Sequence, residues 1–353
     1  MARRVTVRDI AEAANVTAAT VSYVLNNSPN QSISQETRER VLKAAEELQY
    51  VPNTAARSLK NRRSHTIGVA IEKNLSTPRF SQTVAGIRKV LDAHGYNILL
   101  CGFQKRHGIH VDYLNNYFEG RVDGVIFLGK DNQGPDAAAV QMIADRRIPF
   151  VAFDCCQADT GYSTVDFDYQ QGAQTVAQRL LTHCWERLVY IRPQMDTTQE
   201  QAREAGVRAA AAGFPHIRLE ILTVAITQED LDAMDDAGYE NIPEIASRVS
   251  ASMTQALERL PALISSGDAV ISSWESWAGL IRARCEGLDI AIGELANSRD
   301  GRSNADLSLQ LPNFRAGQQC AELLLQALDN TPPQSVVLAQ TCVDSSALPY
   351  VGI

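Results

Sequence analysis

The sequence predicts a small all-α head that contains a helix-turn-helix, followed by a two-lobed α/β body with doubly wound sheets. In the first 50 residues, apolar side chains recur at helical spacing in three segments separated by turn-forming residues. From residue 66 onward, short β-branched runs alternate with longer helical stretches, as in parallel sheets covered by helices on both faces. This second part, about 285 residues long, exceeds one doubly wound sheet and therefore predicts two lobes.

The composition narrows the class of protein. Of 353 residues, 45% are hydrophobic and 21% charged, which suits folded cores and excludes general disorder. No apolar run approaches the roughly 18 to 20 residues of a membrane span, and no apolar signal core follows Met1. Seven cysteines without a CxxC pair favour reduced thiols over a disulfide framework. We therefore expect a cytoplasmic protein with no membrane partner.

The charge is unevenly distributed along the chain. Residues 1–64 hold ten Lys or Arg and six Asp or Glu, a balance of +4, so the remainder of a chain with net charge −8 carries −12. A basic head on an acidic body is expected where only the head contacts a polyanion. A balance of +4 also arises by ordinary scatter, so the motifs must decide between the two.

Three helices are predicted in the head. Thr6 and Asp9 form a capping-box pattern at the start of the first helix, which ends near residue 14. Thr17 is placed to cap a second helix to about residue 25, and Ser34 caps a third through residue 48. The inward positions are expected at Val7, Ile10, Ala11 and Ala14, at Val21, Val24 and Leu25, and at Val41, Leu42, Ala45 and Leu48.

The second helix has an outer face suited to the major groove of DNA. It carries the small residues Ala18, Ala19 and Ser22, which allow the helix to approach base edges closely, and one large polar aromatic, Tyr23. The hydroxyls of Thr17, Thr20 and Ser22 are suited to phosphate oxygens. The alternative is a three-helix bundle whose alanines serve helix propensity alone.

A hinge is predicted between the head and the body. Pro52 ends the third helix, and Asn53 can cap a short segment at residues 54–60. A seven-residue helix is marginal in water, because isolated helices need roughly 12 to 15 residues. We expect it to be helical only when a partner copy and a duplex pack against it, although an ordinary linker is the alternative.

The body has eight predicted strands with helices between them. In an open α/β sheet a ligand binds outside the carboxyl ends of the strands, and between two lobes this places it in the cleft. One helical face, Phe80, Val84, Ile87 and Leu91, follows the first strand, and Gly95 ends that helix. The strands are expected at 67–71, 97–103, 122–128, 149–153, 188–192, 219–224, 269–272 and 290–293.

The head resembles the lactose/galactose-repressor family of bacterial regulators. The resemblance covers the first 60 or so residues, from Val5-Thr-Val-Arg-Asp-Ile-Ala through Thr17-Ala-Ala-Thr-Val-Ser-Tyr-Val-Leu-Asn26 to Ala56-Arg-Ser-Leu-Lys60. It implies that Ala18, Ala19 and Tyr23 contact bases, while Thr17, Thr20, Ser22 and Asn26 contact phosphates. It also implies that Leu59, flanked by Arg57 and Lys60, enters the minor groove and kinks the duplex.

The body resembles the same family more weakly, and the resemblance implies a periplasmic-binding-protein-like fold. Arg121-Val-Asp-Gly-Val-Ile126 and Ile148-Pro-Phe-Val-Ala-Phe-Asp154 are similar to strands of its first lobe, and Val165-Asp-Phe-Asp-Tyr-Gln-Gln-Gly-Ala173 is similar to its crossing into the second lobe. Arg203-Glu-Ala-Gly206 is similar to the motif that places an arginine in the effector cleft, where a guanidinium can hold hydroxyls or a carboxylate. The implied effector-binding residues are Phe80, Asp154, Phe167, Arg203, Trp274 and Glu275, with core packing equally open for Phe80.

The expected domains are a helix-turn-helix DNA-binding domain at 1–50, a hinge at 51–64, and an effector-binding and dimerisation domain at 65–353. Within the last, we expect a first lobe at about 65–164 and 295–315 and a second at about 165–294 and 316–345.

The body departs from the family pattern at the cleft. Ser272-Ser-Trp-Glu-Ser-Trp-Ala-Gly279 stands where an Asn-Asp pair is usual, Glu294-Leu295 replaces an aromatic-Asp-Asp, and His183-Cys-Trp-Glu-Arg187 replaces a Gly-His-Arg turn. Glu275 keeps a carboxylate that is one methylene longer. Trp274 either stacks on a ligand or fills the cleft, and the sequence leaves both roles open. The identity of the effector is open as well.

The function expected from these features is a sequence-specific transcriptional regulator of the repressor type. It would bind a palindromic double-stranded DNA operator as a homodimer and respond to a small-molecule effector, a sugar or related metabolite. The alternatives are a solute-binding protein and an enzyme acting on a sugar or nucleotide. No catalytic residue, cofactor or metal site is predicted, because the Cys155-Cys156 and His183-Cys184 pairs lack further ligands at zinc spacing.

Overall fold

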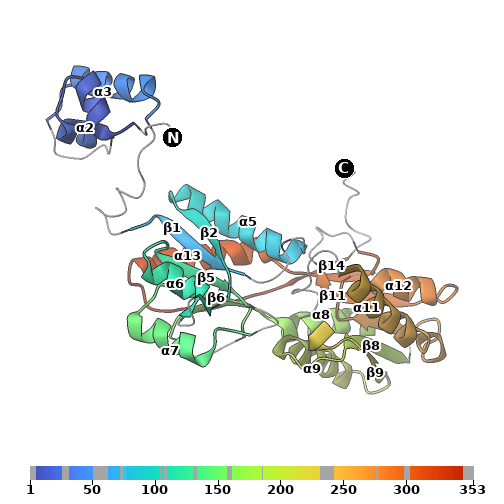
Figure 1. The fold of residues 1–353 in the computed structure, drawn as a ribbon. Coiled ribbons are helices and arrows are strands. Elements are labelled where there is room, and N and C mark those ends of the chain that lie inside the picture. The colour runs from blue at the N-terminus through green and yellow to red at the C-terminus, as the bar shows by residue number, and fades with distance from the viewer. Residues whose placement is uncertain are drawn as a thin grey trace. The chain divides into compact units, whose positions relative to one another are not determined.

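The computed structural model describes residues 5–25, 32–50, 63–71, 75, 77–103, 105–106, 110–129, 133–156, 161–184, 186–230, 242–275, 277–297 and 303–344. The chain divides into two units, residues 1–64 and residues 65–353, and each is described by itself (Figure 1). Among the helices of the described residues, none is long and apolar enough to cross a membrane.

The head is all-α, as predicted. Thr6 caps the first helix, and the predicted capping box is present, since the Thr6 backbone N–H donates to Asp9 Oδ2 at 2.7 Å. Ser34 caps the third helix by accepting from the Thr37 backbone N–H at 3.2 Å. The helices are α1 (Val7–Ala13), α2 (Ala18–Leu25) and α3 (Gln35–Glu47), and their buried apolar residues are Ile10, Ala11, Ala14, Val21, Val24, Val41 and Ala44.

One inward position in the head was predicted wrongly. Leu42 is 48% exposed, and Ala44 is buried instead. The inward stripe of α3 runs through Val41, Ala44 and Leu48, at i, i+3 and i+7. Leu42 follows Val41 by one residue, which turns its side chain by about 100° around the helix axis.

The first lobe is built on a six-stranded sheet in the order β13-β7-β6-β5-β1-β2, and every pairing in it is parallel. Helices α5 and α13 cover one face, and helices α6 and α7 cover the other (Figure 1). The strands are β1 (Thr66–Ala70), β2 (Asn97–Cys101), β5 (Gly124–Leu128), β6 (Phe150–Phe153), β7 (Ser163–Phe167) and β13 (Ser335–Leu338), and the helices are α5 (Pro78–Ala93), α6 (Asp112–Phe118), α7 (Ala137–Arg146) and α13 (Asn313–Leu328). A short pair, β3 (Lys105–Arg106) and β4 (His110–Val111), stands apart.

Two glycines bring α5 and α13 together. A Cβ on Gly86 would lie 2.0 Å from the Phe314 carbonyl oxygen, and one on Gly317 would lie 2.0 Å from the Thr83 carbonyl oxygen. Both approaches are to backbone atoms, which cannot rotate away. This close contact fixes α13 on the first lobe.

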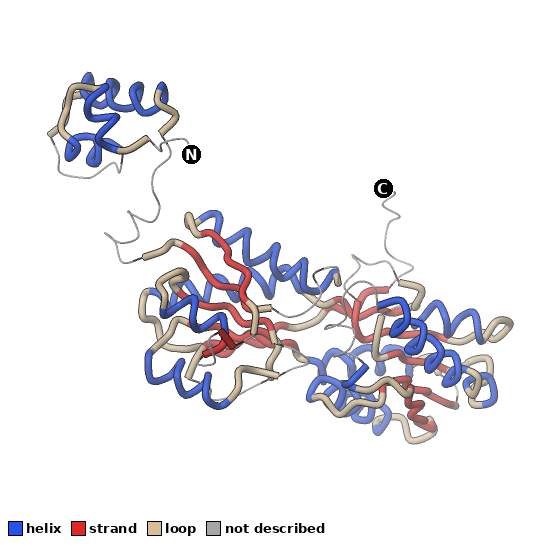
Figure 2. The backbone as a smooth tube through the Cα atoms, viewed as in Figure 1, coloured by secondary structure: helices blue, strands red, loops and turns tan. Residues whose placement is uncertain are grey.

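The second lobe repeats the architecture, with strands inside and helices outside (Figure 2). Its sheet has the order β14-β12-β11-β10-β8-β9, and β14 alone pairs antiparallel, with β12. Helices α8 and α9 cover one face, and α11 and α12 cover the other. The strands are β8 (Arg187–Pro193), β9 (Arg218–Val224), β10 (Ala269–Ser272), β11 (Ala291–Asn297), β12 (Leu307–Gln310) and β14 (Thr341–Asp344), and the helices are α8 (Tyr169–Leu181), α9 (Thr198–Ala212), α11 (Ile242–Leu257), the 3₁₀ turn η1 (Leu260–Ala262) and α12 (Trp277–Arg284).

The two-lobed, doubly wound fold class is confirmed, but the lobes divide differently from the expected boundaries. The strand at 307–310 pairs with β11 and β14 and so belongs to the second sheet, although 295–315 was expected in the first lobe. Helix α13 and strand β13 belong to the first lobe, although 316–345 was expected in the second. In the described residues the chain crosses between the sheets after β7, after β12 and after β13.

The eight predicted strands are present, with ends shifted by a few residues. The strand expected at 97–103 ends at Cys101, and that expected at 290–293 extends as β11 to Asn297. Strands β7, β12, β13 and β14 were not predicted, and neither was the short pair β3 and β4. The expected crossing at 165–173 is confirmed, because β7 lies in the first sheet and α8 packs on the second.

Candidate functional site

Helix α2 presents one outward face that carries the predicted DNA contacts. Thr17, Ala18 and Ala19 are exposed at its start, and Tyr23 is 36% exposed one turn later. The opposite face buries Val21 and Val24 in the head. The outer face is therefore available to a partner, and its first turn presents short side chains, with Thr20 and Ser22 half-buried beside it.

Thr17 caps α2, as predicted. Its Oγ1 accepts from the Thr20 backbone N–H at 3.2 Å and lies 2.9 Å from Thr20 Oγ1. The two hydroxyls therefore bond to each other in the free head. The other predicted DNA contacts, Asn26, Arg57, Leu59 and Lys60, lie outside the described residues, as does the hinge helix expected at 54–60.

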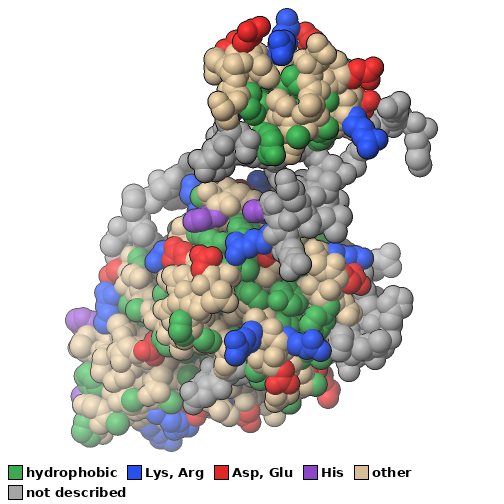
Figure 3. Space-filling model, turned by 90° about the vertical axis from the view of Figure 1, so that its left-hand side faces the viewer, with side chains coloured by type: hydrophobic (Ala, Val, Ile, Leu, Met, Phe, Trp, Pro, Cys, Tyr) green, Lys and Arg blue, Asp and Glu red, His purple; other side chains and the backbone are tan. Residues whose placement is uncertain are grey.

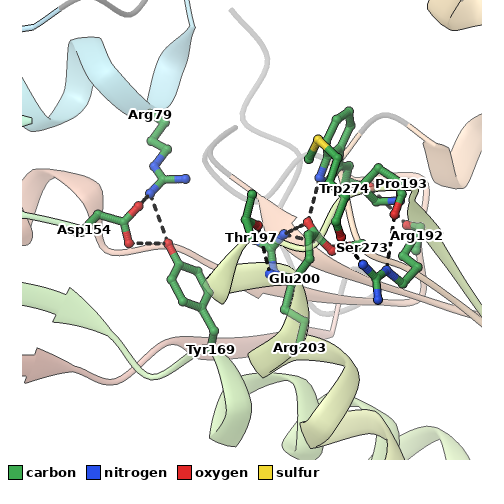
Figure 4. A network of polar contacts seen from close by, with 12 residues as sticks. Arg79, Asp154, Tyr169, Arg192, Pro193, Thr197, Glu200, Arg203, Ser273 and Trp274 are labelled. Carbon is green, nitrogen blue, oxygen red and sulfur yellow. Dashed lines mark hydrogen bonds and ion pairs between the residues drawn. The ribbon is translucent and has the colours of Figure 1, made fainter. Parts of the chain in front are cut away.

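In the body, the first group of predicted effector residues forms around Asp154. This carboxylate is buried, with a backbone φ of 56°, a left-handed conformation that Asp tolerates better than most residues. It forms an ion pair with Arg79 and accepts a hydrogen bond from the Tyr169 hydroxyl at 2.7 Å. Arg79 Nη2 in turn donates to the Tyr169 oxygen at 3.0 Å (Figure 4). Burial raises the pKa of Tyr169 to about 12, so the phenol stays protonated and donates.

Two predicted aromatic residues lie beside this group. Phe167 is buried and meets the rings of Phe153 and Tyr169 edge-on, at centroid distances of 5.5 and 5.9 Å. The Arg79 guanidinium carbon lies 6.0 Å from the Phe167 ring centroid and 5.7 Å from that of Phe80. Phe80 is half-buried at the first turn of α5. Both rings therefore support the arginine that holds Asp154.

The second group forms around Glu200, a residue that sequence reasoning missed. Arg203, 2% exposed, donates from Nη1 to Glu200 Oε1 at 2.9 Å. Ser273 Oγ donates to Glu200 Oε2 at 2.5 Å, and Trp274 Nε1 donates to Oε1 at 3.0 Å (Figure 4). Glu200 is itself 1% exposed, and Thr197 Oγ1 accepts from its backbone N–H at 3.3 Å. The arginine that was expected to hold a ligand therefore bonds to an internal carboxylate.

Tyr169 links the two groups. Its hydroxyl belongs to the Asp154 group, and the Arg203 guanidinium carbon lies 5.1 Å from its ring centroid, within range of a cation–π contact. Arg79 lies on a first-lobe helix, and Arg203 lies on a second-lobe helix. The side chain of Tyr169 therefore joins the two lobes at the point where the chain crosses between them.

The structure brings together most of the expected effector residues, in two linked groups. Asp154, Phe167 and Phe80 surround Arg79, whereas Arg203 and Trp274 meet at Glu200. Trp274 is half-buried and packs on Trp277 at a centroid distance of 5.2 Å, so one side of it fills the lobe. Glu275 is half-buried at the following position.

Four residues of these groups were not predicted. The i, i+3 spacing of Glu200 and Arg203 on one helix was a signal that could have identified that pair. The other contacts join segments far apart in the sequence and left no local signal. The missed residues are Arg79, Tyr169, Glu200 and Ser273.

Asp154, Cys156 and Asp166 form a grouping that the sequence spacing did not indicate. One ligand atom from each lies within 4.8 Å of the others, which suits a metal ion by distance. The carboxylates, however, already bond to protein groups, Asp154 to Arg79 and Asp166 to the Cys156 backbone N–H at 2.8 Å. Burial also raises the pKa of Cys156 to about 11, which keeps its thiol protonated. The three side chains lie close enough together to hold a metal ion, but protein groups already engage both carboxylates and the thiol is protonated, so they do not fit one.

A cavity of about 760 Å³ lies elsewhere, in the second lobe. Residues in and next to α8, α12 and β12 line it, among them Arg179, His183, Arg282 and Asp306. Arg282 already forms an ion pair with Asp306 at 2.9 Å. None of the expected effector residues lines this cavity, so size alone does not make it the candidate site.

The surface of the body shows no single-sign face in the view of Figure 3, where acidic and basic side chains are interspersed. The acidic excess of residues 65–353 is therefore not gathered into one patch on that face.

Two family models match the chain. Residues 6–53 match the model for bacterial regulatory proteins of the lacI family. Residues 64–335 match the model for periplasmic binding proteins and the sugar binding domain of the LacI family. Together they account for both units.

Individual proteins are similar over part or all of the chain. The transcriptional regulator RegA of Clostridium acetobutylicum is 32% identical over 177 residues, 50% of this chain and 51% of that protein. The sucrose operon repressor of Pediococcus pentosaceus is 35% identical over 164 residues, 46% and 48% of the two chains. The chain thus spans about half the length of the curated relatives it matches. A crystal structure of the lac repressor dimer bound to operator and the anti-inducer ONPF has a TM-score of 0.73 at 21% identity and covers 98% of this chain and 100% of that one, which shows a shared fold.

Proposed function

The chain belongs to the lacI family of bacterial regulatory proteins, and on that premise we propose that it is a sequence-specific transcriptional repressor. It binds a palindromic operator as a homodimer and responds to a small metabolite, a sugar or a close relative. The observation that carries the proposal is the joint match of head and body, over residues 6–53 and 64–335. The two alternative functions, a solute-binding protein and an enzyme acting on a sugar or nucleotide, would account for the body alone and leave the head without a role.

DNA binding rests on the outer face of α2. Ala18, Ala19 and Tyr23 are the proposed base contacts, and the first two offer no hydrogen-bonding group, so they recognise thymine methyls or allow close backbone approach. The hydroxyls of Thr17, Thr20 and Ser22 bind phosphates, and Asn26 joins them. Thr17 and Thr20 bond to each other in the free head, and the hydroxyl that accepts in this pair keeps its own hydrogen for a phosphate oxygen.

The hinge supplies the second DNA contact. The segment 54–60 becomes helical beside its copy in a dimer, and Leu59 enters the minor groove between Arg57 and Lys60. This role rests on the family resemblance of Ala56-Arg-Ser-Leu-Lys60.

Regulation rests on the two linked groups in the body. A ligand shifts an equilibrium only when it binds one arrangement of the lobes better than another. Arg79 and Asp154 lie on the first lobe, Glu200 and Arg203 on the second, and Tyr169 bonds to both groups. A ligand that alters this bonding changes the lobe arrangement, and operator and ligand affinities are then linked reciprocally.

Selection from a random duplex pool tests the DNA-binding proposal. The purified full-length chain should enrich a palindromic sequence, and Tyr23→Ala should weaken binding to it. The exposed variant Glu286→Gln in the second lobe is the control and should leave binding unchanged. Failure of a folded, dimeric protein to enrich any duplex would contradict the proposal.

A further inference from the structure

We infer that Glu200 determines the ligand class of the body, selecting an uncharged, hydroxyl-rich ring such as a free sugar and rejecting its phosphorylated form. The inference rests on the proposed effector site and assigns a role to a residue outside the predicted set. It follows from the paired charges around Arg203, the unpartnered Arg203 Nε and the neighbouring aromatic residue Trp274.

The charge of Arg203 is already cancelled. Glu200 accepts from Arg203, Ser273 and Trp274 at 2.5–3.0 Å while only 1% exposed, so both of its oxygens are engaged and its ion pair with Arg203 is internal. A phosphate brought to Arg203 would meet the Glu200 charge at close range. Like charges in a buried site repel strongly, because little water screens them.

The neighbouring cations are paired as well. Arg192 forms an ion pair with Glu204, and Arg79 forms one with Asp154. Each arginine labelled in Figure 4 therefore faces a carboxylate of this protein. An anionic ligand would have to displace one of these carboxylates, which would leave a buried charge without its partner.

One buried donor lacks a partner and suits a hydroxyl oxygen. Among the described residues, Arg203 Nε has no hydrogen-bond partner, although the side chain is only 2% exposed. Tyr190, on β8, is fully buried beside the Glu200 group, and its hydroxyl lies within hydrogen-bonding reach of Ser273. An unpaired buried donor is costly, and a neutral oxygen acceptor removes that cost without adding charge.

The ring of Trp274 is suited to pack against a sugar. Its indole N–H is held by Glu200 at 3.0 Å and its ring is half-buried, so the ring is fixed in orientation while part of its surface stays accessible. An aromatic face held in this way packs against the C–H groups of a sugar ring. Glu200 therefore anchors the aromatic residue and cancels the cation at the same time.

The test compares ligands on the unmodified protein and on Glu200→Gln. Free sugars and their phosphates are titrated in pairs, glucose with glucose 6-phosphate and ribose with ribose 5-phosphate, and inorganic phosphate is titrated at constant ionic strength. In the unmodified protein no phosphate should bind more tightly than its parent sugar. Glu200→Gln frees Arg203 and should gain affinity for inorganic phosphate by about tenfold or more, as expected for a charge-assisted hydrogen bond.

Two controls separate this effect from a general change of charge. Glu258→Gln removes the partner of Arg284 in an exposed pair at 3.6 Å and should gain no phosphate binding. Glu200→Gln with Arg203→Gln removes both charges and should lose the gained affinity. A sugar phosphate that outcompetes its parent sugar on the unmodified protein overturns the inference, and this comparison holds even where Glu200→Gln is too unstable to purify.

Failure of the inference differs from failure of the proposed function. Operator binding is measured on the same unmodified protein. A protein that binds its operator but prefers sugar phosphates, or whose Glu200→Gln variant gains no phosphate affinity, contradicts only the role of Glu200. A protein that binds no operator contradicts the proposed function instead.

Discussion

Replacing Tyr169 with Phe tests the link between the two lobes. The hydroxyl donates to Asp154 at 2.7 Å and accepts from Arg79 at 3.0 Å, and the side chains of those partners are only 7% and 17% exposed. Hydrogen bonds to charged groups contribute about 1.5–3 kcal/mol each. Arg79 and Asp154 keep their direct ion pair in this variant, so neither buried charge is left without a partner. We therefore expect the free energy of unfolding to fall by about 2–3 kcal/mol.

Thermal unfolding measures this loss. For a body of this size, 2–3 kcal/mol corresponds to a fall in Tm of about 3–5 °C. Tyr117→Phe is the matched control, since it removes the hydroxyl of a half-buried tyrosine of the same lobe, where water can replace any lost contact, and it should leave Tm nearly unchanged. A Tyr169→Phe protein that unfolds within about 1 °C of the unmodified one, or a Tyr117→Phe protein that loses as much as expected for Tyr169→Phe, would refute the reasoning.

Three further changes have defined outcomes. Gly317→Ala places a Cβ 2.0 Å from the Thr83 carbonyl oxygen and should cost about 3 kcal/mol in chemical denaturation, whereas Gly213→Ala, 3.4 Å from its nearest neighbour, should cost little. Leu59→Ala should reduce both the bend of the operator and the affinity for it, measured by circular-permutation gel shift, and unchanged values of both would remove the hinge role. Burial raises the pKa of Asp166, so the folded protein holds this proton more tightly than the unfolded chain, and its ionisation destabilises the fold as pH rises through that raised value. Asp166→Asn should therefore weaken the fall of the free energy of unfolding as pH rises from the ordinary aspartate pKa to the raised one. An unchanged slope over this range would contradict the assignment.

The parts of the fold that the sequence predicted are those with strong local signals. Buried central strands read as continuous apolar runs, such as 124–128, and the capping box at Thr6 fixed the first helix. Other strands carry weaker signals. The edge strand β13 alternates exposed and half-buried residues, and its neighbour β7, although buried, contains Ser and Thr that bond across the sheet, as Thr164 does with Ser335 at 2.8 Å.

The lobe boundaries failed for a different reason. Local periodicity identifies α13 as a helix but does not say which sheet it covers, and that choice depends on the close approach of Gly317 to α5. The site shows the same limit. Residues that match a motif, such as Arg203, could be proposed from the sequence, whereas Arg79 and Tyr169 meet across 90 positions through tertiary structure alone.

The most direct test of the account is a linkage measurement. The affinity of the unmodified protein for its selected operator is determined with and without a sugar that stabilises the body, and the affinity for that sugar is determined with and without operator. The account predicts that the two affinities change by the same factor, because one conformational equilibrium couples head and body. Operator binding that is identical at every sugar concentration, with the sugar bound, would contradict it.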